Sequence, residues 1–349
     1  MIVGGIAIAL VLAGLGAWFV LRSRHASAAA KSGEPPKQGA QELRIAAAAD
    51  ASAAEIANKL VTERLWKLAF AAPAQTPPLE PAHAKVGDSV CAILQAETLD
   101  ARYFPRRPAL MPQLMRAVDD PDAATAKLSR MIAHDPVLAA DVLRLANSAM
   151  FRTSPAPVET IQRAIVVLGA DALRGVVATA MLQPVFRATR NNFPRFPRLL
   201  WERTERAVRA AELFALRTHP QDRFEAQLLI LMSALGPLVV YGAVLDAYSA
   251  RRLEPSPSLC AELTAALGPQ VAVHIARQWE SSARLVAAIE RSPDEVLTRI
   301  LQVGELLGTL SLLESQHVIA SDEALATAAD ADLASAIITP IWQRLTTSQ

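Results

Sequence analysis

The chain has 349 residues, of which 52% are hydrophobic, 5% aromatic and 20% charged. This composition excludes disorder throughout the chain, and the scarcity of glycine and aromatic residues disfavours folds with many β-strands. Lys plus Arg (35) nearly equal Asp plus Glu (34), so the overall charge gives no reason to expect a polyanionic partner. The two cysteines, Cys91 and Cys260, lie far apart without a CxxC or Cys/His pattern, which indicates neither a disulfide framework nor a zinc module. We therefore expect an all-α fold with one main domain.

The first feature along the chain is an uncharged apolar run, Ile2–Leu21, which as a helix is long enough to cross a bilayer once. Arg22 and Arg24 follow the run, and no Lys or Arg precedes it. By the positive-inside rule, residues 1–21 are predicted to anchor the chain in the inner (cytoplasmic) membrane, N-terminus out and C-terminal domain in the cytoplasm. A cleaved signal peptide is the alternative, because Ala26–Ala29 resembles a cleavage site, but such peptides normally carry their basic residues before a shorter apolar region.

Three segments separate the anchor from the main domain. Residues 22–51 lack apolar periodicity and are predicted to be a basic, flexible linker. Residues 52–70 place apolar side chains at near-helical spacing among charged ones, which predicts an amphipathic helix that docks on the main domain, a partner or the membrane surface. Residues 71–85 contain four prolines and are predicted to be a second linker.

The main helical domain is predicted to span residues 86–312, followed by a C-terminal helical extension, 313–349. Asp135-Pro136 is its clearest helix start, because Asp caps orphan N–H groups and Pro at the first helical position loses no needed donor. Gly169 is expected to close a short helix in a left-handed conformation. After a Pro-rich loop, the pattern predicts helices at approximately 198–217, 223–235, 237–250, 258–278, 281–290 and 294–312.

A series of short motifs in this region resembles the HDOD domain. The motifs follow one another with the family's spacing: Pro108–Pro112, Asp120–Asp122, His134–Leu138, Leu143–Ala149, Ile161–Ile165 and Leu168-Gly169. The resemblance covers about residues 100–310 and is strongest over 108–185. It implies an all-α module related to HD-type metal phosphohydrolases and a non-catalytic role in bacterial signalling. The residues that carry the family motifs are Asp135, Pro136, Asn147, Ser148 and Gly169.

HD-type phosphohydrolases need His and Asp ligands around a divalent metal, and the resemblance identifies where these would stand. Each such position holds a residue that cannot replace the ligand: Arg203, Ser233, Ala234, Gly268 and Ser292. We therefore predict no metal, no cofactor and no enzymatic activity, with a degenerate metal-dependent phosphohydrolase as an alternative.

The dipeptide His134-Asp135 has the sequence of the metal-binding His-Asp pair of HD-type phosphohydrolases. It lies in the first half of the domain, however, whereas the resemblance places that pair in the second half. We interpret Asp135 as the cap of the helix that begins at Pro136, because no other His has ligand spacing around it. Asn147-Ser148 is expected to satisfy backbone groups at the end of that helix, with a ligand or partner contact as the alternative.

A cationic strip lies between Arg187 and Arg209. Arg195, Arg198, Arg206 and Arg209 are candidates to bind an anion or a partner, since guanidinium groups suit phosphate contacts. A nucleotide or nucleic acid is one such ligand and anionic lipid another, although the near-neutral chain makes nucleic acid an unfavoured partner. The alternative without a ligand is a solvated helix face in which Glu202 pairs with Arg206 and Glu205 with Arg209.

These observations predict a membrane-tethered, non-enzymatic HDOD scaffold that acts in bacterial signal transduction by contacting a protein partner. The membrane contact is assigned to residues Ile2–Leu21.

Overall fold

The computed structural model describes residues 55–73, 80–95, 132, 136–147, 156–187, 192–292, 296–331 and 335–347. No strand occurs in these ranges, which confirms the all-α prediction. The helices are an unlabelled one at 55–70 and then α3 (Pro81–Leu94), α6 (Pro136–Ala146), α7 (Ile161–Arg187), α8 (Arg195–Thr218), the 3₁₀ turn η1 (Pro220–Asp222), α9 (Arg223–Arg251), α10 (Pro257–Gln278), α11 (Ala283–Ile289), α12 (Val296–Ser315), α13 (Ser321–Asp330) and α14 (Ser335–Thr346).

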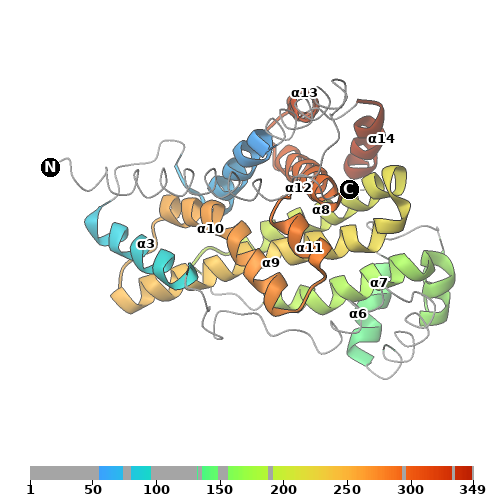
Figure 1. Ribbon diagram of the computed structural model, residues 1–349, viewed down its shortest axis with the longest axis horizontal. Helices are drawn as coiled ribbons and strands as arrows, with labels where there is room; N and C mark the ends of the chain where they lie inside the picture. Colours follow the sequence, from blue (N-terminus) through green and yellow to red (C-terminus); the bar gives the residue numbers. More distant parts are fainter. Residues whose placement is uncertain are drawn as a thin grey trace, which may run out of the picture.

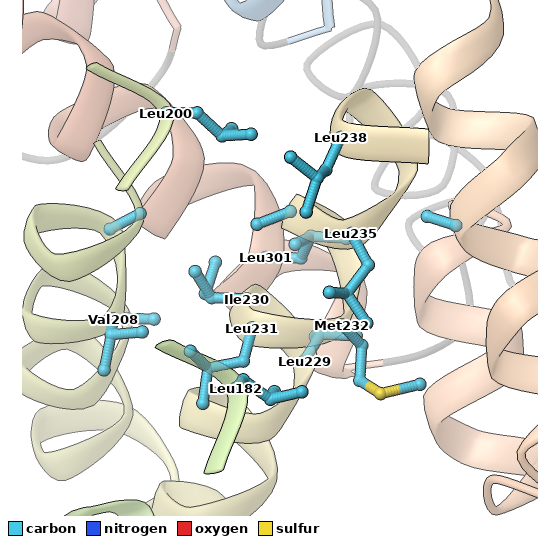
Figure 2. Packing of buried hydrophobic residues seen from close by; sticks show 14 of the residues in the cluster. Leu182, Leu200, Val208, Leu229, Ile230, Leu231, Met232, Leu235, Leu238 and Leu301 are labelled. Atoms are coloured by element: carbon cyan, nitrogen blue, oxygen red, sulfur yellow. The ribbon is translucent and has the colours of Figure 1, made fainter. Parts of the chain in front are cut away.

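Helix α9 runs through the middle of the domain, with α6 and α7 toward one end and α3 and α10 toward the other (Figure 1). It is apolar around almost its whole circumference, as expected for a helix with neighbours on every side. Figure 2 shows side chains of α9 packed with Leu182 of α7, Val208 of α8 and Leu301 of α12. This core fixes the positions of the helices that build the candidate site.

The sequence predicted two helices, 223–235 and 237–250, where the structure has the single helix α9. Pro237 lies inside it, although an interior proline removes one backbone hydrogen bond. At this point α9 touches α10: a Cβ added to Gly236 would lie 2.0 Å from the carbonyl oxygen of Gly268. Burial of both halves of α9 therefore outweighs the helix-breaking tendency of proline, an effect that local sequence does not reveal.

Helices α8 and α12 also approach each other closely. A Cβ at Gly308 would lie 2.5 Å from the backbone nitrogen of Ala207, and one at Gly304 would lie 2.8 Å from the Cβ of Ala211. Two glycines on α12 thus face two alanines on α8, which lets the backbones come together. This contact sets the distance between the polar side chains that the two helices carry.

The helix at 55–70 packs into the domain along one face. Trp66 and Phe70 are buried, and the Phe70 ring stacks on Phe196 of α8 at a centroid distance of 4.6 Å. Its opposite face carries Ile56 and Leu60, each 57% exposed. The part of the chain that the structure describes therefore places this helix, 55–70, on the main domain.

Two predicted boundaries fall inside helices. Helix α3 begins at Pro81, within the predicted linker 71–85, because proline at a first helical position loses no needed donor. Helix α12 runs to Ser315, past the limit set at residue 312. Beyond it, α14 lies against α8 and α12 and buries Ile341 and Trp342.

Three described helices are long and apolar enough to cross a membrane by length and composition: Pro220–Arg251, Pro257–Gln278 and Val296–Ser315. Their most apolar windows are 94%, 61% and 89% buried within the domain. Burial in a helical core explains this apolar character as well as a bilayer would. The predicted anchor, residues 1–21, and the linker 22–51 lie outside the described residues.

Candidate functional site

Two of the substituted ligand positions come together in the interior. Arg203 on α8 is 4% exposed, and its Nη2 lies 3.3 Å from Oε1 of Glu305 on α12. Ser233 on α9 donates its hydroxyl to the same Glu305 oxygen at 3.1 Å. The Nε of Arg203 also donates to the hydroxyl of Thr309, at 3.1 Å. Three helices are thus joined by hydrogen bonds and an ion pair at the place where the family resemblance puts metal ligands.

A second arginine completes this group. Arg291, which follows α11, donates through Nη2 to Oε2 of Glu305 at 2.7 Å. Each carboxylate oxygen of Glu305 therefore has its own guanidinium partner. We call Arg203, Ser233, Arg291 and Glu305 the buried polar network.

The charge state of Glu305 follows from these neighbours. Burial by itself would raise the pKa of this carboxyl, but the positive charges of Arg291 and Arg203 and their hydrogen bonds hold it below its usual value. Glu305 is therefore ionised at neutral pH although it is buried. A buried charge persists only when it is paired and hydrogen-bonded, as here.

The remaining substituted positions have structural roles. Ala234 is buried among apolar side chains, and Gly268 supplies the close contact between α9 and α10. The carbonyl oxygen of Ser292 accepts a hydrogen bond of 2.7 Å from the hydroxyl of Thr298, at the start of α12.

The buried polar network does not fit a divalent metal. Such an ion needs several neutral or anionic donors, whereas here two guanidinium cations flank the single carboxylate. Within the described ranges, no three His, Cys, Asp or Glu side chains gather closely enough to hold an ion. A small cavity of about 60 Å³ beside the network is lined by Arg203, Ser233, Thr264, Arg291 and Glu305 among others.

Glu305 and Arg291 were not identified from the sequence. A signal for Glu305 existed, because it is the one acidic residue in the long apolar run of α12 before Glu314. A lone carboxylate at an apolar helix position predicts a buried partner. Nothing comparable marks Arg291, since it follows a short helix and meets α12 only in the folded chain.

Three of the residues that carry the family motifs, Pro136, Asn147 and Gly169, lie in α6, directly after α6 and in α7, respectively. Pro136 is the first residue of α6, as predicted, while Asp135 and Ser148 lie outside the described residues. Asn147 donates to the carbonyl oxygen of Val158 at 2.8 Å and accepts from its N–H at 2.7 Å. Asn147 thus satisfies backbone groups at the end of α6.

Gly169 interrupts α7 with φ 77° and ψ 170°. Because this backbone conformation is not helical, α7 consists of two helical segments that meet at Gly169, and the positive φ there favours glycine.

The arginines of the predicted strip have different surroundings. Arg195 and Arg198 are exposed, and Arg198 pairs with Glu202 at 3.1 Å. Arg206 donates instead to α12, reaching the hydroxyl of Ser311 at 2.7 Å. Burial lowers the pKa of Arg206 and of Arg209. Of these four candidate arginines, Arg195 and Arg198 are thus exposed, whereas Arg206 and Arg209 are partly buried.

A comparison with known families agrees with this geometry. The model of the HDOD domain matches residues 104–294, which is more than half of the chain. The chain belongs to the HDOD domain family. No curated protein gives a significant match.

Two crystal structures show the same fold. One is an HDOD domain protein of unknown function from Geobacter sulfurreducens, 17% identical, with a TM-score of 0.51 over 75% of this chain and 88% of that one. The other, from Shewanella amazonensis SB2B, bears the provisional name of a metal-dependent phosphohydrolase; it is 16% identical, with a TM-score of 0.54 over 77% of this chain and 99% of that one. The fold is thus shared with an HDOD domain protein and with a protein that is named as a metal-dependent phosphohydrolase.

Proposed function

We propose that this chain is a non-enzymatic HDOD scaffold, tethered to the inner membrane by residues 2–21, that acts in bacterial signal transduction by binding a protein partner. The observation that carries the proposal is the buried polar network. Arg203 and Ser233 occupy the positions at which the resemblance implies metal ligands, and they bind Glu305 instead. A phosphohydrolase of this class needs its metal to activate water, and two guanidinium groups at that point repel a cation.

The network also suggests what replaced the metal. An ion that binds side chains of several helices holds those helices together, and the network does the same through α8, α9, α12 and the turn after α11. The fold is thereby kept while the chemistry is lost, which leaves the surface of the domain as the functional part.

The test uses the full chain in detergent micelles, assayed for hydrolysis of phosphomonoesters, phosphodiesters and nucleotides with Mg²⁺, Mn²⁺ or Fe²⁺ added. We expect no hydrolysis above a protein-free blank. Metal-dependent hydrolysis that is lost in Glu305→Gln and kept in the surface variant Glu323→Gln would overturn the non-enzymatic assignment.

The scaffold role is tested by cross-linking in intact cells, followed by identification of the captured proteins. We expect a specific cytoplasmic partner to be captured by the wild-type chain and lost when Gly308→Leu disrupts the packing of α8 against α12. Fractionation of the same cells should place the chain with the inner membrane, and recovery in the soluble fraction would contradict the tether.

A further inference from the structure

A groove of about 740 Å³ runs between the helix at 55–70 and α10. It is open because the α10 wall consists largely of small residues, namely Ala261, Ala265 and Ala266. The opposite wall carries the longer polar side chains of Lys59, Glu63 and Lys67 among others. The volume lies within the range of about 300–1,000 Å³ that is usual for small-molecule sites.

The groove leads to the buried polar network. Its lining shares Thr62, Ala265, Pro269 and Arg291 with the 60 Å³ cavity beside Arg203 and Glu305. Arg291 therefore belongs both to the groove and to the network, with its side chain 23% exposed.

The charges of the network are not balanced. Arg203 and Arg291 carry two positive charges, and Glu305 carries one negative charge. Nη1 of Arg291 is buried and has no hydrogen-bond partner among the described residues. An excess charge and an unsatisfied donor in the interior both cost free energy, and an anion beside Arg291 would relieve both.

The backbone conformation of Arg291 helps to position its side chain. Its φ is 60°, a left-handed conformation at the turn that ends α11, where glycine is preferred. The Arg291 N–H donates to the carbonyl oxygen of Ala288 at 3.0 Å, which fixes the turn. This turn therefore holds the Arg291 side chain at the junction of the two cavities.

We propose that this groove binds a small organic anion, whose carboxylate or phosphate group is held by the guanidinium of Arg291 at the junction with the buried polar network. Binding requires a local shift that brings Nη1 into contact with the ligand. The inference goes beyond the scaffold function, because it holds whatever the protein partner is. Binding of this anion would make the non-enzymatic domain responsive to a small molecule.

The walls of the groove limit the class of anion. Glu63 and Glu262 line it from opposite sides, and burial together with the Glu63 charge raises the pKa of Glu262. The lining as a whole carries three acidic side chains (Glu55, Glu63 and Glu262) and three basic ones (Lys59, Lys67 and Arg291), and this balance of charge disfavours a polyanion such as nucleic acid. It favours a small ligand with one anionic group, whose remaining part donates hydrogen bonds or carries a positive charge.

The experiment measures thermal unfolding of the full chain in micelles with sodium phosphate, sodium acetate or sodium chloride at equal ionic strength. We expect phosphate or acetate to raise the midpoint by a few degrees over chloride at about ten times its Kd. The salt that raises the midpoint shows whether the groove binds a phosphate or a carboxylate group. The gain should vanish in Arg291→Gln and remain in Arg198→Gln, which removes an exposed arginine outside the groove.

A second variant covers the case in which Arg291→Gln does not fold. Ala265→Leu narrows the junction of the groove with the network without altering a charge, and it too should abolish the gain. Equal midpoints in all three salts would overturn the proposal, as would a phosphate or acetate effect that persists in Ala265→Leu or in folded Arg291→Gln.

Discussion

The Nη2 atom of Arg203 on α8 lies 3.3 Å from Oε1 of Glu305 on α12, and the side chains of both residues are almost fully buried. A pair of this kind adds little to stability compared with well-packed apolar residues, but it is costly to break on one side. The Arg203–Glu305 pair therefore makes the positions of α8 and α12 depend on both residues.

Replacement of Glu305 by Gln should lower the free energy of unfolding by about 3–5 kcal/mol, because the buried guanidinium of Arg203 and the partly buried one of Arg291 lose their only carboxylate in the network. Urea unfolding followed by circular dichroism measures the change. The control is Glu323→Gln, which removes the exposed ion pair with Arg64 and should cost less than about 1 kcal/mol. Equal stability of the two variants would show that Glu305 has no structural role.

The stabilisation by Glu305 should depend on pH. Since the folded-state pKa of Glu305 is below the usual 4.5, the ionised side chain stabilises the fold above that pH, and the contribution is lost as the pH falls through the folded-state value. The difference in unfolding free energy between wild type and Glu305→Gln should therefore be largest at neutral pH and shrink below pH 4.5. A difference that stays constant with pH would contradict the depressed pKa.

The contact of α8 with α12 should not tolerate a side chain at Gly308. Gly308→Ala brings a Cβ within 2.5 Å of the Ala207 nitrogen, so one backbone must move, and we expect a loss of about 1–3 kcal/mol. Gly242→Ala is the matched control on α9, where nothing lies within 4 Å of the added carbon. It should be neutral or stabilising by up to about 1 kcal/mol, because alanine favours helix. Thermal unfolding of both variants checks the contrast.

The helix at 55–70 should be required for stability of the domain. Phe70→Ala removes a buried ring that stacks on Phe196, and we expect a loss of about 3–5 kcal/mol. Leu60→Ala on the exposed face of the same helix should change stability by less than about 0.5 kcal/mol. A small effect of Phe70→Ala would mean that the main domain is stable without this helix.

Much of the helical pattern was predictable. Regular apolar spacing and punctuation such as Asp135-Pro136 and Gly169 act locally, so they indicated where helices begin, end or kink. Pro237 shows the limit of this reasoning, because its local tendency to end a helix is overcome by burial on all sides of α9. The family motifs likewise fixed the fold class, since several short patterns in order are more specific than any one of them.

The sequence by itself determined that the expected ligand positions hold Arg203 and Ser233, because the identity of a side chain decides whether it can bind a metal. Only the tertiary structure decided what these residues do instead. Glu305 and Arg291 reach them from α12 and from the turn after α11, and contacts between residues so distant in the chain arise from packing, which no local pattern encodes.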